Sequence, residues 1–361
     1  MKHITCFTAN LGRGGAEHQI VLLSNLLAER GYDVTLVTYN TIPDEFELHP
    51  YIRRIRLDVE GNLIKKELII SRFFLRHETD CIISYRSTPN FIMLLAMVLR
   101  KKPKIICSER NTTIIPNIKE KINYNYLYKR AAYIVPNSYS QARYLKGLGK
   151  SWSDRIVPIT NYTELDKYVP APNPPLEDVM LFGVIARIFP QKNYERFCQM
   201  LAVLKKNAKR PFKVIWYGDR QDGDHSKGST HIRQLINELD IDDVIEVRPA
   251  ILDVVEAMSQ FHVMCLPSLY EGFSNSLSEY ICCGKPVVCS AVSDNSLMVH
   301  EGENGYLFDP TRIDSMSDAF QRILAASQED LDEMGKSSRR IAEELFDQEA
   351  FVDKYIALIE A

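Results

Sequence analysis

Short apolar segments with the length of strands alternate with amphipathic segments along almost the whole of this 361-residue chain. Residues 4–8 form the first expected strand and residues 34–38 the second, and between them Ile20, Leu23 and Leu27 recur at helical spacing. Where strands and helices alternate in this way, the strands pair in parallel and helices cover both faces of the sheet. The sequence therefore predicts an α/β fold.

The alternation runs in two series, which a proline-rich stretch separates. Residues 170–175 read Pro-Ala-Pro-Asn-Pro-Pro, and these four prolines fit neither a helix interior nor a central strand. We interpret residues 170–178 as a linker between an N-terminal domain, 1–169, and a C-terminal domain, 179–346. We expect both to be Rossmann-like and doubly wound, with a ligand-binding cleft beyond the carboxyl ends of the strands.

The expected strands of the first series are residues 4–8, 34–38, 52–57, 80–84, 104–108, 132–136 and 156–160. Between them we expect helices at residues 63–77, 89–100, 118–130 and 139–147. The expected strands of the second series are residues 179–186, 212–217, 244–248, 262–266 and 286–290. Its helices are expected at residues 193–207, 230–239, 252–259, 275–283, 314–326, 328–345 and 348–360.

Composition excludes several other classes of protein. The chain is 45% hydrophobic and 25% charged, which is typical of a globular protein. Its longest apolar run, residues 91–99, is far shorter than the roughly 20 residues that span a bilayer. The N-terminus has no secretory signal pattern, and no pair of the eight cysteines has C-x-x-C spacing. We therefore expect a cytoplasmic protein.

Charge is divided unevenly between the two halves. Residues 1–170 hold 25 Lys and Arg against 16 Asp and Glu, a net charge of +9, whereas residues 171–361 carry −12. A basic half favours an anionic partner, either a phosphorylated acceptor, an acidic membrane surface or a nucleic acid, unless its lysines are simply solvated. Segments 63–76 and 119–130 mix apolar and basic side chains. They can lie on an anionic lipid surface at the inner face of the cell membrane, or pack as ordinary amphipathic helices.

The strongest local pattern covers residues 267–279, which read Pro-Ser-Leu-Tyr-Glu-Gly-Phe-Ser-Asn-Ser-Leu-Ser-Glu. A strand delivers Glu271 to a glycine turn, and Ser274 or Asn275 can cap a helix whose free N–H groups bind phosphate oxygens. Glu279 lies about one turn inside that helix, where its carboxylate can accept two hydrogen bonds from a ribose diol. Alternatively, both glutamates are ordinary cap and surface groups.

A second cluster, residues 187–193, reads Arg-Ile-Phe-Pro-Gln-Lys-Asn directly after the first strand of the second series. Arg187 and Lys192 are two cations at a strand's carboxyl end. They can neutralise a diphosphate and the negative charge that grows on it when an ester or glycosidic bond breaks. A solvated loop is the alternative.

Together these patterns resemble retaining glycosyltransferases of family four, which have the GT-B architecture of two Rossmann-like domains facing across a cleft. The most specific feature is the pair Glu271 and Glu279 with seven residues between them, followed by Cys-Gly-Lys-Pro-Val-Val at 283–288. The Arg187 to Asn193 segment, Gly-Gly-Ala-Glu at 14–17 and Glu-Gly-Glu-Asn-Gly-Tyr-Leu at 301–307 also match in order and spacing. The resemblance covers nearly the whole chain.

The resemblance implies retaining transfer of a hexose or N-acetylhexosamine from a nucleotide diphosphate sugar, expected to be UDP-linked, to a hydroxyl of a growing glycan. The implied catalytic residues are Arg187 and Lys192, at the diphosphate, and Glu271, near the donor sugar. Implied donor-binding residues are Gly14, Gly15, Gly272, Phe273, Ser274, Asn275 and, at the ribose, Glu279. Neither a cofactor nor a catalytic metal is expected, and residues 347–361 are expected to return to the N-terminal domain.

Two stretches depart from the family pattern. Where many members place a His in the first domain, this chain reads Cys-Ser-Glu-Arg-Asn at 107–111, which resembles the subset that extends polyprenyl-diphosphate-linked oligosaccharides. Glu109, Arg110 and Asn111 are therefore acceptor-side candidates, although Arg110 can equally be a structural ion-pairing residue. Residues 292–296, Val-Ser-Asp-Asn-Ser, replace the usual Gly-Gly-x-x-Glu.

Three other functions stay open at this point. A nucleotide-sugar 2-epimerase shares the two-domain architecture. An NAD-dependent enzyme fits the sequence less well, because residues 12–15 lack the third glycine of G-x-G-x-x-G. A nucleic-acid-binding module also fits less well, because the basic residues form no recognition element. Asp222-Gly223-Asp224-His225 looks like a metal-binding motif, but we interpret it as a solvated turn.

Overall fold

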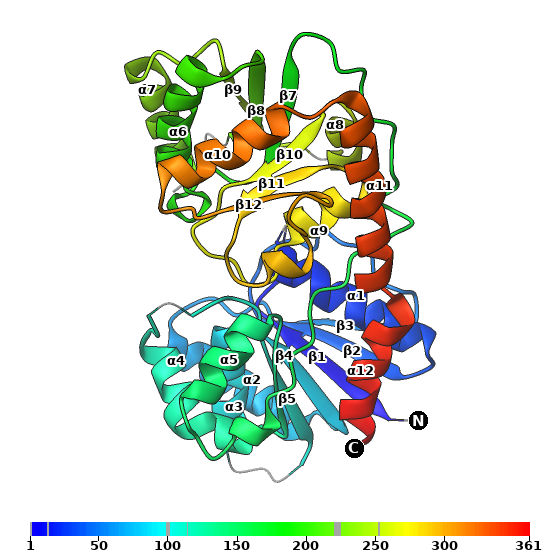
Figure 1. The fold of residues 1–361 in the computed structure, drawn as a ribbon. Coiled ribbons are helices and arrows are strands. Elements are labelled where there is room, and N and C mark those ends of the chain that lie inside the picture. Colours follow the sequence, from blue (N-terminus) through cyan, green and yellow to red (C-terminus); the bar gives the residue numbers. More distant parts are fainter. Residues whose placement is uncertain (1, 13, 99–101, 114, 220–224, 252) are drawn as a thin grey trace. The chain divides into compact units, whose positions relative to one another are not determined.

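The structure is a computed structural model that describes residues 2–12, 14–98, 102–113, 115–219, 225–251 and 253–361 (Figure 1). By their internal contacts these residues form two compact units. The first unit consists of the residues up to Tyr162 together with Gln348–Ala361, and the second unit consists of Thr163–Asp347.

The first unit is built on a sheet of six parallel strands. In spatial order these are β3 (Arg53–Arg56), β2 (Asp33–Thr38), β1 (His3–Thr8), β4 (Cys81–Tyr85), β5 (Lys104–Glu109) and β6 (Tyr133–Pro136). Ile4 pairs with Val34 on one side and with Cys81 on the other, so the chain winds outward in both directions from β1. The strand order therefore reverses between β1 and β4.

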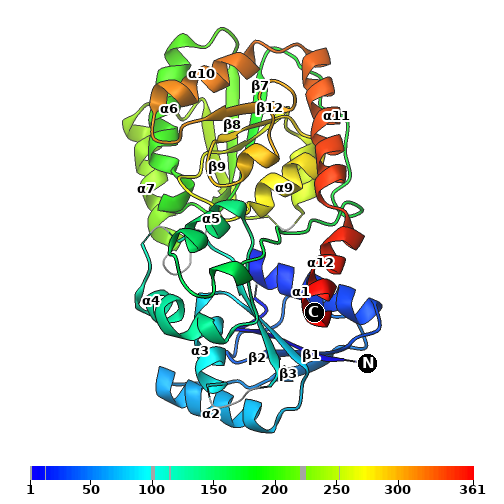
Figure 2. The ribbon, with the colours of Figure 1, turned by 60° about the horizontal axis from the view of Figure 1, so that its bottom comes forward.

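Helices enclose this sheet, and every residue of β4 is buried. The C-terminal helix α12 (Gln348–Glu360) packs beside α1 (Gly15–Glu29) (Figures 1 and 2). The Tyr355 hydroxyl on α12 lies 3.0 Å from the Tyr85 hydroxyl at the end of β4. The helices of the unit are α1 (Gly15–Glu29), α2 (Leu63–Arg76), α3 (Ser87–Ala96), α4 (Ile118–Ile122), η1 (Asn123–Leu127), η2 (Tyr128–Arg130), α5 (Tyr139–Gly147), η3 (Ser153–Arg155) and α12 (Gln348–Glu360).

The second unit repeats this topology. Its spatial order is β12 (Gly305–Phe308), β11 (Val287–Ser290), β10 (Val263–Leu266), β7 (Met180–Ile185), β8 (Phe212–Asp219) and β9 (Ile245–Pro249), all parallel. Here the order reverses between β7 and β10. Its helices are η4 (Pro190–Lys192), α6 (Tyr194–Asn207), α7 (His225–Glu238), α8 (Val254–Ser259), α9 (Asn275–Cys282), η5 (Asn295–Leu297), α10 (Ile313–Leu324) and α11 (Gln328–Leu345).

The predicted fold class, with two doubly wound parallel sheets, is confirmed, but three predicted details are wrong. The strand expected at 156–160 is only an isolated bridge between Ile134 and Ile156, although the N–H groups of Val157 and Ile159 donate to carbonyls of β6. The helix expected at 118–130 splits into α4, the π-helix η1 and the 3-10 helix η2. Strand β12 was not predicted.

The boundary between the units also differs from the prediction. The first unit ends at Tyr162 rather than at residue 169. The proline-rich segment lies on the second unit itself: the Asn173 side-chain amide donates to the Leu331 carbonyl at 3.1 Å, and Leu176 N–H donates to Gln328 Oε1 at 2.6 Å. Packing against α11 therefore fixes these residues, which makes them part of the second unit and not a free tether.

The described residues contain no helix that is both long and apolar enough to cross a bilayer. All eight cysteine thiols are buried and free.

Candidate functional site

The predicted site residues of the second unit lie where its strand order reverses. Arg187 and Lys192 follow β7, and Glu271 follows β10, the strand that pairs with β7. Ligands of doubly wound sheets bind outside the carboxyl ends of the strands at this switch point. The topology therefore brings the two sequence clusters to the position where a ligand is expected.

Three contacts join the two clusters directly. Leu269 N–H donates to the Gln191 carbonyl at 2.8 Å, and the Gln191 side-chain amide donates to the Tyr270 carbonyl at 2.9 Å. Lys192 Nζ donates to Glu271 Oε1 at 2.5 Å, with 13% and 9% of the two side chains exposed. The loops after β7 and β10 therefore form one hydrogen-bonded structure, with an ion pair at its centre.

Asn193 holds the end of the loop that carries Lys192. It is buried, its φ is +57°, and its side-chain amide donates to the Pro310 carbonyl at 2.8 Å. A left-handed conformation is uncommon for a residue other than glycine, and it persists where the surroundings enforce it. The anchor at Pro310 supplies that constraint, and it fixes Lys192 one residue earlier.

Arg187 is an exposed residue directly after β7. The backbone behind it is fixed by Trp216, whose indole N–H donates to the Ala186 carbonyl at 2.7 Å. Gly218 completes this contact, because a Cβ on it would lie 1.9 Å from the same carbonyl oxygen. The chain is thus held at residue 186, while the Arg187 side chain extends into solvent.

Helix α9 begins at the glycine turn, as its sequence predicts. Ser274 is the N-cap, and its hydroxyl accepts a hydrogen bond from Leu277 N–H at 3.3 Å. Asn275 is the first helical residue. Phe273 is buried and its ring packs edge-on against Phe346, with centroids 6.2 Å apart. The N-terminal turn of α9 therefore lies beside Gly272, and the N-terminus of a helix is where an anion site is expected.

Glu279 lies on α9 and accepts a hydrogen bond from the Tyr168 hydroxyl at 3.1 Å. Burial, together with the neighbouring carboxylate, raises the pKa of Tyr168, so this hydroxyl stays a donor. Arg339 holds the backbone of this tyrosine in place, because its Nη1 donates to the Tyr168 carbonyl at 2.8 Å. Sequence reasoning missed Tyr168, which stands 111 residues before its partner without a local motif to mark it.

Residues 292–296, which depart from the family pattern, contact the glycine turn before α9. Ser293 has a φ of +51°, a conformation that glycine adopts without strain. Its hydroxyl donates to the Gly272 carbonyl at 2.6 Å. In this chain, therefore, a serine takes the left-handed position and adds a hydrogen bond that glycine lacks.

Gly14 and Gly15 lie beyond β1 at the switch point of the first unit. A Cβ on Gly14 would lie 2.3 Å from a Glu17 carboxylate oxygen, so a side chain at this position would displace the carboxylate. Glu17 is buried and pairs with Arg86 Nη1 at 2.6 Å. Arg86, with a φ of +79°, is the N-cap of α3 directly after β4. Sequence reasoning missed this residue, because the pairing of β1 with β4 brings it to Glu17.

The three acceptor-side candidates lie at the end of β5 in different environments. Glu109 is buried and accepts hydrogen bonds from the Tyr128 hydroxyl and, at 3.4 Å, from the Ser87 hydroxyl. Burial, reinforced by the nearby Glu120 carboxylate, raises the pKa of Glu109 to about 8. Arg110 is also buried, whereas Asn111 is exposed.

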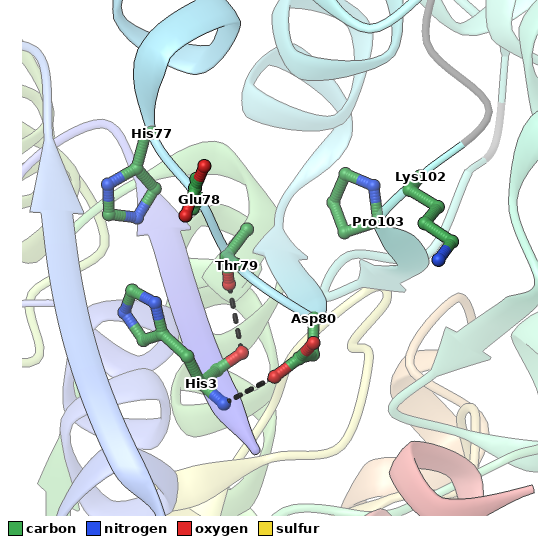
Figure 3. Close-up of a pocket in the computed structure, with 7 residues that line it drawn as sticks. All are labelled: His3, His77, Glu78, Thr79, Asp80, Lys102 and Pro103. Carbon is green, nitrogen blue, oxygen red and sulfur yellow. Dashed lines mark hydrogen bonds between the residues drawn. The ribbon is translucent and has the colours of Figure 1, made fainter.

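Two other features are separate from these residues. Asp222 and Asp224 lie outside the described residues, and the described residues hold no group of three or more His, Cys, Asp or Glu that suits a metal ion. A pocket at the amino ends of β1, β4 and β5 lies at the opposite edge of the first sheet (Figure 3). Its His3 and His77 rings are engaged with Thr35 and Thr5, each at 2.8 Å. No predicted site residue lines this pocket.

Family models match both units. The model described as "Glycosyltransferase Family 4" matches residues 13–167, and the model described as "Glycosyl transferases group 1" matches residues 170–341. The chain is 24% identical over 319 residues to a Campylobacter jejuni enzyme named N-acetylgalactosamine-N,N'-diacetylbacillosaminyl-diphospho-undecaprenol 4-alpha-N-acetylgalactosaminyltransferase. That match covers 80% of this chain and 81% of the relative.

Solved structures agree with this at the level of the fold. Sucrose-phosphate synthase from Thermosynechococcus elongatus superposes with a TM-score of 0.85 and 19% identity, over 100% of this chain and 98% of the other. Anabaena HepE, solved in complex with UDP and glucose, superposes with a TM-score of 0.80 and 15% identity over the full length of both chains. From the two family models, the relatives and the shared fold, we conclude that this chain is a glycosyltransferase of family 4 with the GT-B fold.

Proposed function

We propose that this glycosyltransferase takes a hexose or N-acetylhexosamine from a UDP-linked donor and transfers it, with retention, to a hydroxyl of a growing lipid-diphosphate-linked glycan. A UDP donor is supported by the Anabaena neighbour that was solved with UDP and glucose. A lipid-linked acceptor is supported by the Campylobacter relative and by an Escherichia coli relative, 26% identical over 187 residues, that is named as a galactosyltransferase acting on a diphosphoundecaprenol.

The observation that carries the proposal is the joined pair of loops at the switch point of the second unit. Lys192 and the N–H groups of the first turn of α9 belong to two neighbouring loops that hydrogen bonds hold together. A diphosphate bound there meets Lys192 and the α9 amides, and Arg187 reaches it from the end of β7. Glu279 binds the ribose diol, and Tyr168 orients the carboxylate for that role.

In this proposal the protein assists departure of the diphosphate. As the bond between the sugar and the diphosphate breaks, negative charge grows on the phosphate oxygens, and Arg187 and Lys192 stabilise that charge without a metal ion. Glu271 contacts the sugar hydroxyls from beside Lys192. The leaving diphosphate accepts the proton of the attacking hydroxyl on the same face of the sugar, which retains the anomeric configuration.

Peripheral contact with an anionic membrane is the second part of the proposal. On α2, Ile70 and Phe74 are buried, whereas Ile64, Leu68 and Leu75 are 71%, 67% and 59% exposed. The same helix carries basic side chains, at positions 65, 66, 72 and 76. An exposed apolar face flanked by cations is suited to a surface of anionic lipid, where a lipid-linked acceptor would be presented.

The test is to incubate the full-length protein with a panel of nucleotide sugars and a short-chain lipid-diphosphate glycan, and to follow nucleotide release and product mass. We expect one UDP-sugar to be consumed and NMR of the product to show the donor's own anomeric configuration. Inversion, or a preferred donor that is not UDP-linked, would refute that part of the proposal. Conversion of UDP-N-acetylglucosamine to its 2-epimer in the absence of an acceptor would show that the protein is an epimerase and not a transferase.

A further inference from the structure

Arg110 is a buried cation for which the described residues supply no acidic partner. Of the arginines that the structure describes, it alone is buried, with 6% of its surface exposed. Its Nη1 donates to the Ser108 hydroxyl at 3.3 Å, its Nη2 donates to the Asn161 side-chain carbonyl, and its guanidinium lies over the Tyr85 ring, 4.6 Å from the centroid. Each of these contacts is to an uncharged group.

The Arg110 guanidinium is also incompletely hydrogen-bonded. Its Nε is fully buried and has no partner among the described residues. Beside it, the Asn137 side-chain oxygen is buried without a partner as well, while the Asn137 amide donates to the Asn161 side chain at 3.3 Å. Buried polar groups are nearly always paired in native proteins, so an unpaired donor on a buried charge needs an explanation.

The neighbouring carboxylates do not supply the missing charge. Glu109 precedes Arg110 in the chain, but its carboxyl group contacts the Tyr128 and Ser87 hydroxyls instead. Burial, with the Glu120 charge nearby, raises the pKa of Glu109 to about 8, so this group is mainly neutral at pH 7. At the switch point, in contrast, Glu17 balances Arg86 directly. A buried guanidinium without such a balance is unfavourable unless an anion joins it.

We propose that Arg110 binds a phosphate group of the acceptor substrate. This inference rests on the proposed function, because a lipid-diphosphate acceptor brings such a group to the first unit. A phosphate supplies both things that Arg110 lacks, a negative charge and oxygen acceptors that suit the planar N–H groups of a guanidinium. The position agrees, since Arg110 follows β5, the strand next to β4 at the carboxyl edge of the first sheet.

The donor also carries a diphosphate, so the experiment has to separate binding of the acceptor's phosphate from binding of the donor's diphosphate. Calorimetry on the full-length protein should measure binding of geranyl diphosphate, a short soluble lipid diphosphate, in the presence of saturating UDP. Geraniol, which has no phosphate, is the parallel ligand. The variants are Arg110→Met, which removes the charge, and Arg110→Lys, which keeps it. The matched control is Arg155→Met, an exposed arginine of the same unit whose guanidinium donates to two backbone carbonyls.

We expect Arg110→Met to weaken geranyl diphosphate binding about 10-fold to 100-fold, the range for losing hydrogen bonds to a charged group. Arg110→Lys should show an intermediate loss, Arg155→Met no loss, and geraniol no binding. UDP affinity should stay the same in every variant. The inference is wrong if the Met variant binds geranyl diphosphate as tightly as wild type, or if wild type does not bind it. Failure of wild type to bind UDP would instead refute the proposed donor.

Stability separates this role from a structural one. Removing a buried charge that has no counter-ion should leave the melting temperature of Arg110→Met within about 3 °C of wild type, or raise it. A structural arginine would give a large decrease in melting temperature, with loss of UDP binding as well. If Arg110→Met does not fold, Arg110→Lys decides: geranyl diphosphate affinity equal to wild type in that variant would contradict recognition by the guanidinium group.

Discussion

Lys192 Nζ lies 2.5 Å from Glu271 Oε1, and the two side chains come from different loops of the same unit. The sequence predicts separate roles for them, one at the diphosphate and one near the donor sugar. Their pairing means that each charge is balanced before any ligand binds. A bound diphosphate therefore shares Lys192 with Glu271, and both residues contribute to stability as well as to the reaction.

Removing one member of this pair should destabilise the protein. We expect Lys192→Ala to lower the free energy of unfolding by about 3 kcal/mol, because it leaves a largely buried carboxylate without its partner. The double variant Lys192→Ala/Glu271→Ala should recover part of that loss. Urea unfolding of Lys192→Ala, Glu271→Ala and the double variant tests the coupling, and strictly additive effects would show that the pair contributes nothing.

Arg187→Ala should behave differently, because this side chain is exposed. We expect its stability to stay within about 0.5 kcal/mol of wild type and its turnover to fall roughly 10²–10³-fold, the range for losing one charge-stabilising donor. Lys206→Ala, at an exposed position on α6, is the control and should leave both quantities unchanged. Losses under threefold for both Arg187→Ala and Lys192→Ala would place the diphosphate elsewhere.

Glu279→Ala should weaken nucleotide binding more than it slows turnover at saturating donor. We expect the Kd for UDP to rise about 10-fold or more, since two hydrogen bonds from the ribose to a charged acceptor are lost. Tyr168→Phe should give a smaller rise, because only the group that orients the carboxylate is removed. Calorimetry with UDP measures both, and unchanged affinity in the Glu279 variant would contradict the ribose assignment.

Glu109 should make stability depend on pH. Its pKa is raised to about 8 in the folded protein, above the ordinary carboxyl value of the unfolded chain. The folded state therefore holds a proton that the unfolded state has lost, and stability falls as pH rises from about 4.5 to 8, by up to about 1.4 kcal/mol per pH unit. Glu109→Gln should remove this slope, so its stability relative to wild type increases toward pH 8. Parallel curves for the two proteins in urea unfolding from pH 5 to 8.5 would refute the raised pKa.

Leu68→Glu should reduce binding to vesicles of anionic lipid. The side chain is 67% exposed on α2, so the change adds a negative charge at the proposed membrane face without disturbing the core. Tyr51→Glu, 83% exposed in the same unit but outside α2, is the control. Co-sedimentation with phosphatidylglycerol and phosphatidylcholine vesicles measures the difference. Equal binding by both variants, or no preference for the anionic lipid, would argue against the α2 surface.

Much of the fold could be predicted from local patterns. The helix at 348–360 and the cap at Ser274 depend on neighbouring residues alone, and so they are readable in the sequence. Strand β12, Gly305–Phe308, was missed because it begins with a glycine, which does not favour a strand, and it forms through its pairing with β11. The η1 segment was missed for a similar reason: the Trp152 indole N–H bonds to the Tyr124 carbonyl and stabilises a form that periodicity does not indicate.

The sequence by itself determined the alternation, the two series and the residue types at the ends of the strands, because helical and strand periods, caps and glycine turns are properties of adjacent residues. Only the tertiary structure decided which of these residues meet. Strand order brought Arg86 to Glu17 and Lys192 to Glu271, and the packing of a loop against α9 brought Tyr168 to Glu279. The fold also buried Arg110 where no described residue supplies a counter-charge. Such contacts join residues far apart in the chain, so they depend on how the sheets assemble and leave no local signal in the sequence.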